Sequence, residues 1–350
     1  MSGMQLALFS GLINGLLMFS QFASAAATPP CTRQLTPDDD LAAVFRNLPE
    51  QGDHQTLCLG AGDYHLDGMV EIRRSQVTLR GEGKEKTFLR MKAGVSSPVL
   101  VIGDAHHQEP DRTISNVRIE ALAIRGSRES TTEFFPSLPY LSNSALIVRR
   151  GANITLQDLD VRHCRSACVL TEYNSSDILL ANSHISDAQW DGISLNRAGP
   201  TSLVGNTIRD NVAAGITVEY MTASVFRNNI IAGNGSHGVY LADAEHNEIR
   251  DNEIEDNHLA GIFLTCSIQD HEAVQCWEGS ISRDNRFIDN VFSDNRFGYQ
   301  VAVDQSANCL GWDSPRNVSS GDSFLLSPNH EPSWENFGRC LSYQGSHTVR

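Results

Sequence analysis

Short runs of alternating apolar and polar residues recur along most of this chain at a constant spacing. Segments 203–218, 226–241 and 249–264 align without gaps at a period of 23 residues. The alignment contains one glycine column and two asparagine columns: Gly215, Gly238 and Gly261; Asn206, Asn229 and Asn252; Asn211, Asn234 and Asn257. Segments 179–195 and 286–301 continue the pattern upstream and downstream.

Each repeat consists of runs such as Gly-Ile-x-Leu that are bounded by Asn, Asp and Gly. Alternation predicts strands with one buried face, and no run is long enough to favour a helix. Three short strands per repeat predict one coil of a parallel β-helix, in which each strand stacks about 4.8 Å from its copy in the next coil. The asparagine columns then receive a structural interpretation, because stacked amides hydrogen-bond to one another and Asn tolerates left-handed turns.

Over residues 56–306 this pattern resembles the right-handed parallel β-helix proteins of the pectin-lyase-like superfamily. The resemblance implies an all-β fold, a single-stranded right-handed parallel β-helix, with an N-terminal capping helix. Residues 36–48 are expected to form that helix, with aspartates in its first turn. We expect an N-terminal cap over residues 28–55, the β-helix over 56–306 and a C-terminal cap over 307–350.

Residues 1–27 are predicted to be a secretory signal peptide. A mostly apolar run from Leu6 to Phe22 is followed by small residues at 23–27. No Lys or Arg precedes that run, so an uncleaved anchor is the alternative. We predict a periplasmic or extracellular protein with no membrane span after cleavage.

The composition adds constraints on partners and on covalent structure. The net charge of −15 argues against nucleic acid and anionic membranes as partners, whereas an anionic polysaccharide would need a local basic patch. Eight cysteines in an exported chain suggest disulfides, although 105 pairings are formally open. Proximity in sequence favours Cys31–Cys58, Cys164–Cys168, Cys266–Cys276 and Cys309–Cys340.

One strand face is the candidate functional surface. In the Gly-Ile-x-Leu strands the position x points outward, and charged and aromatic residues follow at the strand exits. Three long interruptions, at 104–113, 127–144 and 266–276, flank this strand and are expected to wall a groove.

A groove of this kind suits a sugar polymer, particularly one containing uronates. Removal of the proton beside a uronate carboxyl group needs a base, a proton donor and a cation. The candidate catalytic residues are His237, Tyr240, Arg197 and Glu219. The candidate substrate-binding residues are Arg149, Arg150, Glu172, Tyr173, Asn196, Tyr220 and Asp191.

Simpler interpretations stay open for these residues. His237 occupies a variable corner position that is commonly just a solvated turn, and the Arg and Glu strip also fits a ladder of weak salt bridges. The pectate-lyase-like R-x-P-x-x-R run and the epimerase-like D-P-H motif are absent, and the aspartates of the polygalacturonase-like pattern are incomplete.

Two functions from different classes therefore remain. The first is a secreted β-helix protein that acts on an acidic polysaccharide as a lyase or C5-epimerase. The second is a non-catalytic periplasmic protein that binds glycan or assists another process. A metal-dependent accessory role is a third interpretation, but the twelve histidines show no repeated metal spacing. We predict no cofactor, with a requirement for calcium left open.

Overall fold

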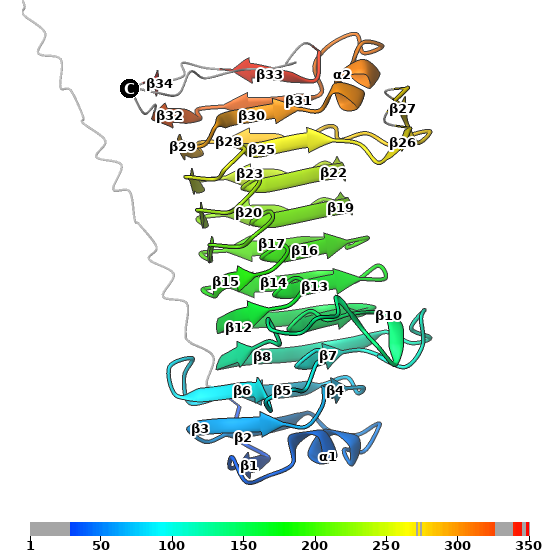
Figure 1. Cartoon of the computed structure of the whole chain (residues 1–350), viewed down its shortest axis with the longest axis vertical. Helices are drawn as coiled ribbons and strands as arrows, with labels where there is room; N and C mark the ends of the chain where they lie inside the picture. The colour runs from blue at the N-terminus through cyan, green and yellow to red at the C-terminus, as the bar shows by residue number, and fades with distance from the viewer. Residues whose placement is uncertain (1–28, 271, 274, 326–338, 345–347, 350) are drawn as a thin grey trace, which may run out of the picture. The chain divides into compact units, whose positions relative to one another are not determined.

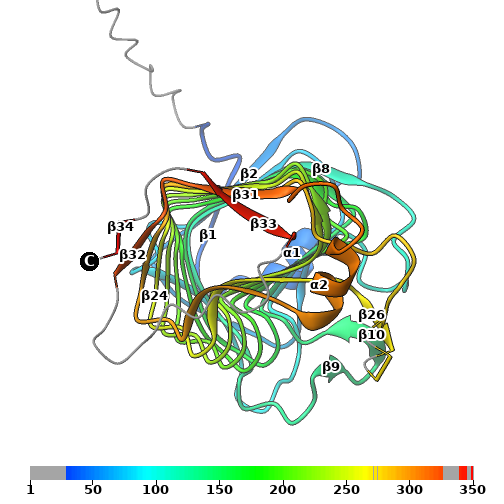
Figure 2. The same ribbon diagram turned by 90° about the horizontal axis from the view of Figure 1, so that it is seen from above.

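A computed structural model describes residues 29–270, 272–273, 275–325, 339–344 and 348–349. The signal peptide predicted at residues 1–27 lies outside this described part. Residues from Cys31 onward form a stack of coils with three parallel strand faces (Figures 1 and 2). The strands of each face pair in parallel with their equivalents in adjacent coils, which confirms the predicted all-β, right-handed parallel β-helix.

The first face of the stack consists of β1 (Arg33–Leu35), β2 (Gln55–Leu59), β5 (Val77–Arg80), β8 (Ile114–Arg125), β12 (Gly151–Cys164), β14 (Ser176–Ala181), β17 (Thr201–Val204), β20 (Val225–Arg227), β23 (Glu248–Arg250), β28 (Arg286–Ile288), β31 (Asn317–Ser320) and β33 (Leu341–Gln344). The long strands β8 and β12 continue around the corner into the second face. That face also contains β3 (Gly62–Leu66), β6 (Thr87–Met91), β15 (His184–Ala188), β18 (Thr207–Arg209), β21 (Ile230–Ala232), β24 (Glu253–Glu255), β29 (Val291–Ser293), β32 (Ser323–Leu325) and β34 (Thr348–Val349).

The third face carries the candidate groove. It consists of β4 (Val70–Ile72), β7 (Leu100–Ile102), β11 (Leu146–Arg149), β13 (Val169–Glu172), β16 (Ile193–Asn196), β19 (Ile216–Thr222), β22 (Val239–Glu245), β25 (Ala260–Thr265) and β30 (Phe297–Val301). Its register keeps the repeat period, with Ser194 opposite Thr217 and Thr217 opposite Tyr240. Outward side chains of successive coils therefore form continuous columns.

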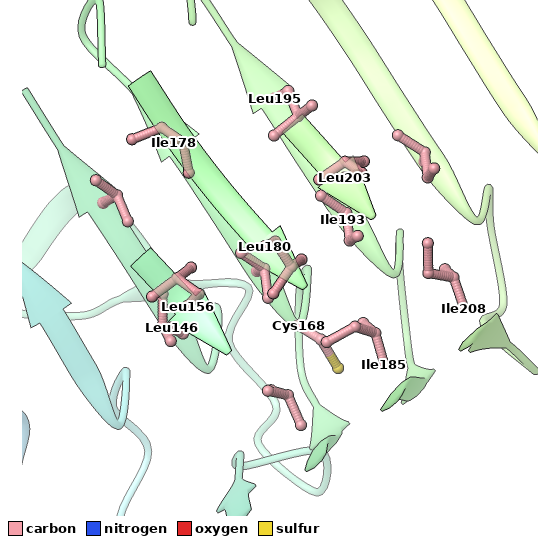
Figure 3. Packing of buried hydrophobic residues seen from close by; sticks show 14 of the residues in the cluster. Leu146, Leu156, Cys168, Ile178, Leu180, Ile185, Ile193, Leu195, Leu203 and Ile208 are labelled. Carbon is pink, nitrogen blue, oxygen red and sulfur yellow. The ribbon is translucent and has the colours of Figure 1, made fainter. Parts of the chain in front are cut away.

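The interior of the stack is filled by aliphatic side chains from all three faces. Figure 3 shows Leu180 and Leu203 from the first face, Ile185 and Ile208 from the second, and Ile193 from the third. All five are almost completely buried. This arrangement follows from the alternation in sequence, because every second residue of a strand points to the same side.

The asparagine columns form the predicted ladders. Asn206 Nδ2 donates to Asn229 Oδ1 at 3.0 Å, and Asn229 Nδ2 donates to Asn252 Oδ1 at 2.9 Å. In the second ladder, Asn211 Nδ2 donates to Asn234 Oδ1 at 2.9 Å. Each Oδ1 also accepts a main-chain N–H from the coil below, so the amides satisfy turn groups that are buried from water. The structural interpretation of these asparagines is confirmed.

The two ends of the stack differ from the sequence-based expectation in detail. Helix α1 (Leu41–Arg46) begins later than the predicted residue 36, and its first turn contains no acidic residue. Asp40 instead precedes the helix as its N-cap, accepting the main-chain N–H of Ala43 at 3.0 Å. At the other end, helix α2 (Val303–Cys309) is followed by parallel pairing of β31 with β28. Coil stacking thus extends past residue 306.

All four proposed cysteine pairs are present as disulfides, Cys31–Cys58, Cys164–Cys168, Cys266–Cys276 and Cys309–Cys340. Two interruptions form antiparallel hairpins, β9 (Phe134–Phe135) with β10 (Leu138–Ser142), and β26 (Ile268–Asp270) with β27 (Gln275–Cys276). Figure 2 shows both hairpins on the same side of the stack. Neither helix in the described part has the length and apolar character needed to cross a bilayer.

Candidate functional site

The β9–β10 hairpin covers part of the outward side of the third face. Its Leu141 packs in a buried apolar cluster with Val101, Ile147 and Leu170, which point outward from β7, β11 and β13. The strands β7, β11 and β13 therefore carry apolar residues on both faces of the sheet, as expected where a second layer covers a strand. The hairpin is thereby fixed as one wall beside the uncovered strands β16 and β19.

A cleft of about 420 Å³ lies where the hairpin ends and these strands become exposed. Hairpin residues line one side of it, and outward side chains of β13, β16 and β19 line its floor. Six of the sequence-predicted site residues meet here, namely Glu172, Tyr173, Asp191, Asn196, Arg197 and Glu219. They come from three successive coils and converge because the coils are in register.

Asp191 is a buried acid of the cleft whose pKa is strongly raised. It lies in the turn before β16, is 3% exposed, and accepts the main-chain N–H of Ala214 at 3.0 Å. Burial raises the pKa of Asp191 to about 6, although hydrogen bonds from Thr217 and Ala214 favour the charged form. The negative charge of Glu219 adds to the increase in this pKa. Asp191 therefore exchanges a proton close to neutral pH, as acid–base groups must.

Glu219 and its neighbours form the polar exit of the same strands. Asn196 Nδ2 donates to Glu219 Oε2 at 2.5 Å between adjacent coils. Arg197 is exposed, and its guanidinium carbon lies 5.5 Å from the ring centre of Tyr220. Because Arg197 lines the cleft and is exposed, its guanidinium can reach a ligand carboxylate or hydroxyl there.

His237 and Tyr240 lie one coil further along than the cleft floor. The His237 ring stacks on Phe263 with centroids 4.3 Å apart, and its Nδ1 accepts the main-chain N–H of Ala260 at 3.2 Å. That bond places the proton of the neutral ring on Nε2. Burial lowers the pKa of His237 to about 4, and burial also raises the pKa of Tyr240. Both groups are therefore uncharged proton donors at neutral pH rather than bases.

The shifts of Asp191 and His237 predict opposite pH dependences of stability. Asp191 has an ordinary pKa of 3.8, so between about pH 4 and 6 the folded chain keeps a proton that the unfolded chain releases, and stability falls as pH rises. His237 has an ordinary pKa of 6.5, so between about pH 4 and 6.5 the unfolded chain binds a proton that the folded chain does not, and stability falls as pH decreases.

We expect Asp191→Asn to gain stability relative to wild type as pH rises through this window, and His237→Gln to gain it as pH falls. Urea unfolding between pH 4 and 7 measures both differences. Asp38→Asn and His65→Gln, at exposed positions outside the cleft, serve as the matched control variants. If the stability difference from wild type changed with pH in the same direction for Asp191→Asn and His237→Gln, the opposite pKa shifts of the two groups would be contradicted.

Arg149 and Arg150 hold the 104–113 loop. Arg149 is fully buried, and it donates to Glu172 and to the main-chain carbonyls of Asp104, His107 and Gln108. Arg150 donates to the carbonyl of Pro110. The guanidinium carbon of Arg149 also lies 5.5 Å from the ring centre of Tyr140 and 5.0 Å from that of Tyr173. Because its contacts are with the protein itself and it does not line the cleft, we assign Arg149 a structural role in holding the loop.

Three aromatic residues of the cleft, Phe134, Tyr140 and Trp190, were missed by the sequence-based prediction, and two of them are strongly exposed. Trp190 is 55% exposed directly before Asp191, and Phe134 is 47% exposed on the hairpin. The repeat contained a signal for Trp190: it is a large aromatic residue at a position where the next two coils have the small residues Ala213 and Ser236. Phe134 had no such signal, because the position of the hairpin does not follow from the repeat.

Solved structures that resemble the chain share its fold at low sequence identity. An alginate lyase from Paenibacillus sp. has a TM-score of 0.56 and 14% identity, covering 91% of this chain and 99% of that one. The tailspike of E. coli bacteriophage HK620, described in complex with a hexasaccharide, has a TM-score of 0.62 and 13% identity, covering 84% of this chain and 54% of the tailspike. ORF18 of Geobacillus virus E2 has a TM-score of 0.58 and 14% identity, covering 85% and 54%. The chain thus spans about half the length of these two viral proteins.

No curated protein sequence matches the chain. Residues 116–323 match the family described as periplasmic copper-binding protein (NosD). Copper sites use thiolate, thioether or imidazole ligands. Here all eight cysteines form disulfides, and the described residues contain no group of three or more His, Cys, Asp or Glu placed to hold a metal ion. Among the described methionines, Met221 is buried in the core, whereas Met69 and Met91 each line a pocket. The described residues therefore contain no cluster of thiolate, imidazole and carboxylate groups for copper or for calcium.

The family match extends from β8 to β32, through every coil that contributes to the cleft. It covers more than half of the chain, and the periplasmic location of the family confirms the predicted cellular location. The chain belongs to the NosD family of periplasmic copper-binding proteins.

Proposed function

We propose that this protein binds a polysaccharide in the cleft between the β9–β10 hairpin and strands β16 and β19. The observation that carries the proposal is the exposed Trp190 at the edge of a cleft with a polar floor. Sugar rings present an apolar face for aromatic packing and hydroxyl groups for hydrogen bonding. Trp190, Phe134 and Tyr173 supply the first kind of contact.

Polar groups on the floor supply the second kind. Ser194, Thr217 and Asn196 present hydroxyl and amide groups, and Asp191 and Glu219 offer acceptors for sugar hydroxyls. The fold supports the proposal in a general way, since the HK620 tailspike carries a hexasaccharide on a related fold. The volume of about 420 Å³ lies in the usual range for small-ligand pockets.

The charges lining the cleft bear on the type of sugar. Its carboxylates are Glu133, Glu172, Asp191 and Glu219, and Glu172 is paired with Arg149. Arg197 is the exposed cation among the cleft-lining residues. A uronate would therefore have to place its carboxylate at Arg197, whereas neutral sugars fit the remaining length without repulsion.

A panel of glycans tests the binding function directly. We expect the protein to bind at least one oligosaccharide from a set containing alginate, pectin, glycosaminoglycan, xylan and mannan fragments, measured by calorimetry. Binding of uronate-containing members should weaken in Arg197→Gln, while neutral members should be unaffected. Absence of binding to every member by folded protein would contradict the proposed function.

A second candidate function is uronate lyase or C5-epimerase chemistry. It is favoured by one observation, the raised pKa of Asp191 beside Glu219 on the face that also presents Tyr240. In this scheme Arg197 neutralises the uronate carboxylate, and Asp191 or Glu219 removes the proton from the adjacent C5. In a lyase, Tyr240 or the Nε2–H of His237 donates a proton to the glycosidic oxygen as its bond to C4 breaks and the C4–C5 double bond forms. In an epimerase, the same donor returns a proton to C5 from the opposite face.

We expect such activity to appear as unsaturated uronate absorbance for a lyase, or as a changed epimer ratio in NMR spectra for an epimerase. Asp191→Asn should reduce the rate at least about 100-fold, the usual contribution of a general acid or base. Asp38→Asn, at an exposed position outside the cleft, is the control. Binding of a uronate glycan with an unchanged product profile would exclude the enzymatic function and leave the binding function intact.

A further inference from the structure

A second pocket, at the N-terminal end of the third face, is rich in arginine although the protein is acidic overall. It has a volume of about 340 Å³ and lies between α1, β4 and the 104–113 loop. Its cationic residues are Arg46, Arg73, Arg74 and Arg112, its carboxylates are Glu50 and Glu71, and His106 also lines it. The excess of cations is notable in a chain with a net charge of −15.

One of these arginines is structural and helps to shape the pocket. Arg74 is 5% exposed and donates to the main-chain carbonyls of Pro49, Gly52, Asp53 and Ser75. These bonds fix the segment after α1 against the end of β4. The main chain around the pocket is therefore held in place by hydrogen bonds, which gives the pocket a defined shape.

The other three arginines are weakly engaged by protein groups. Arg73 Nε lies 3.8 Å from Glu71 Oε1, and that oxygen already accepts the main-chain N–H of Ala105 at 2.8 Å. Arg112 Nη1 lies 3.6 Å from Glu50, which is itself strongly exposed. Both distances exceed those of charge-assisted hydrogen bonds.

Arg46 ends α1 and is exposed, with no ion pair to any residue in the described part of the chain. Phe45, Leu48 and Met69 add apolar side chains to the lining of the pocket. A pocket lined by guanidinium groups and apolar side chains favours a ligand with an anionic group on a partly apolar body.

We propose that this pocket binds an oxyanion, a carboxylate or phosphate group carried on a small ring or chain, with Arg46, Arg73 and Arg112 as its donors. The inference does not depend on glycan binding in the cleft. Strand β4 lies four strands from β16 in the third face, about 19 Å at the usual strand spacing, and the hairpin-covered apolar cluster separates the two sites.

The test uses two probes, inorganic phosphate and glucuronate, titrated calorimetrically at low ionic strength. We expect saturable binding of at least one probe with one site per chain. Arg46→Gln and Arg73→Gln should each weaken binding about tenfold, as expected for loss of one charge-assisted contact. Added salt should weaken binding as well. Preference for phosphate or for glucuronate distinguishes the two sources of the anion.

Arg227→Gln is the matched control, because Arg227 is an exposed arginine on β20, far from the pocket in the coil order. It should bind the probes like the wild type. Thermal unfolding verifies that each variant is folded. Absence of saturable binding for both probes, or equal losses in Arg227→Gln and Arg46→Gln, would overturn the proposal.

Discussion

Replacing Trp190 with alanine is expected to weaken binding of the preferred glycan about 30-fold, equivalent to about 2 kcal/mol. The side chain is 55% exposed at the edge of the cleft, beside the buried Asp191. Its truncation removes the largest apolar surface offered to a sugar ring. Calorimetric titration of wild type and variant with the best ligand of the panel gives the ratio of dissociation constants.

The chain provides a closely matched control for this experiment. Trp277, after β27, is also 55% exposed, but it does not line the cleft. Trp277→Ala should retain wild-type affinity. Both substitutions remove exposed aromatic area, so each should leave thermal stability almost unchanged. If the two variants bind the glycan equally well, Trp190 is not a ligand contact and the cleft assignment is wrong.

Replacing Asn229 with alanine should destabilise the protein by about 3 kcal/mol or more, because several buried polar groups lose their partners together. The main-chain N–H and the Nδ2 of Asn206 both donate to Asn229 Oδ1. In the other direction, Asn229 Nδ2 donates to the carbonyl of Leu203 and to Asn252 Oδ1. Urea unfolding followed by circular dichroism measures the loss.

Two further variants separate the ladder from the mere loss of an amide. Asn47→Ala removes an exposed asparagine at the end of α1 and should change stability by less than about 0.5 kcal/mol. Asn229→Asp keeps the acceptor oxygen but turns a second oxygen toward the carbonyl of Leu203 and Asn252 Oδ1, so it should lose at least as much stability as Asn229→Ala. The ladder can end in Asp322 because its second oxygen accepts hydroxyl hydrogen bonds from Tyr299 and Ser319. A loss for Asn229→Ala no larger than that for Asn47→Ala would refute the ladder as a source of stability.

The candidate site was only partly predictable from sequence. Glu172, Asn196 and Glu219 occupy neighbouring coils at the same strand position, so the repeat alone placed them side by side. Arg149 belongs to the same column, yet it became a buried anchor because the 104–113 loop folds back onto it. The position of a residue in its strand determines which way its side chain points, whereas the exposure of that side chain depends on the loops that cover the strand.

The sequence by itself determined the features that repeat. Apolar alternation specified which side chains enter the core, the period of 23 residues specified the strand register, and the asparagine columns specified the ladders. Local cysteine spacing was sufficient to suggest the four disulfides. Each of these depends on interactions between equivalent positions of adjacent coils, so the pattern in one coil predicts its partner in the next.

Only the tertiary structure decided how the insertions fold onto this scaffold. The hairpin at 127–144 buries Val101 and Ile147, yet leaves Trp190 exposed beside it. Helix α1 ends with Arg46 in the same pocket as Arg112, although the two residues are distant in sequence. Insertions have no equivalent in neighbouring coils, so their positions depend on side-chain packing and hydrogen bonds with distant residues, which no periodic pattern encodes.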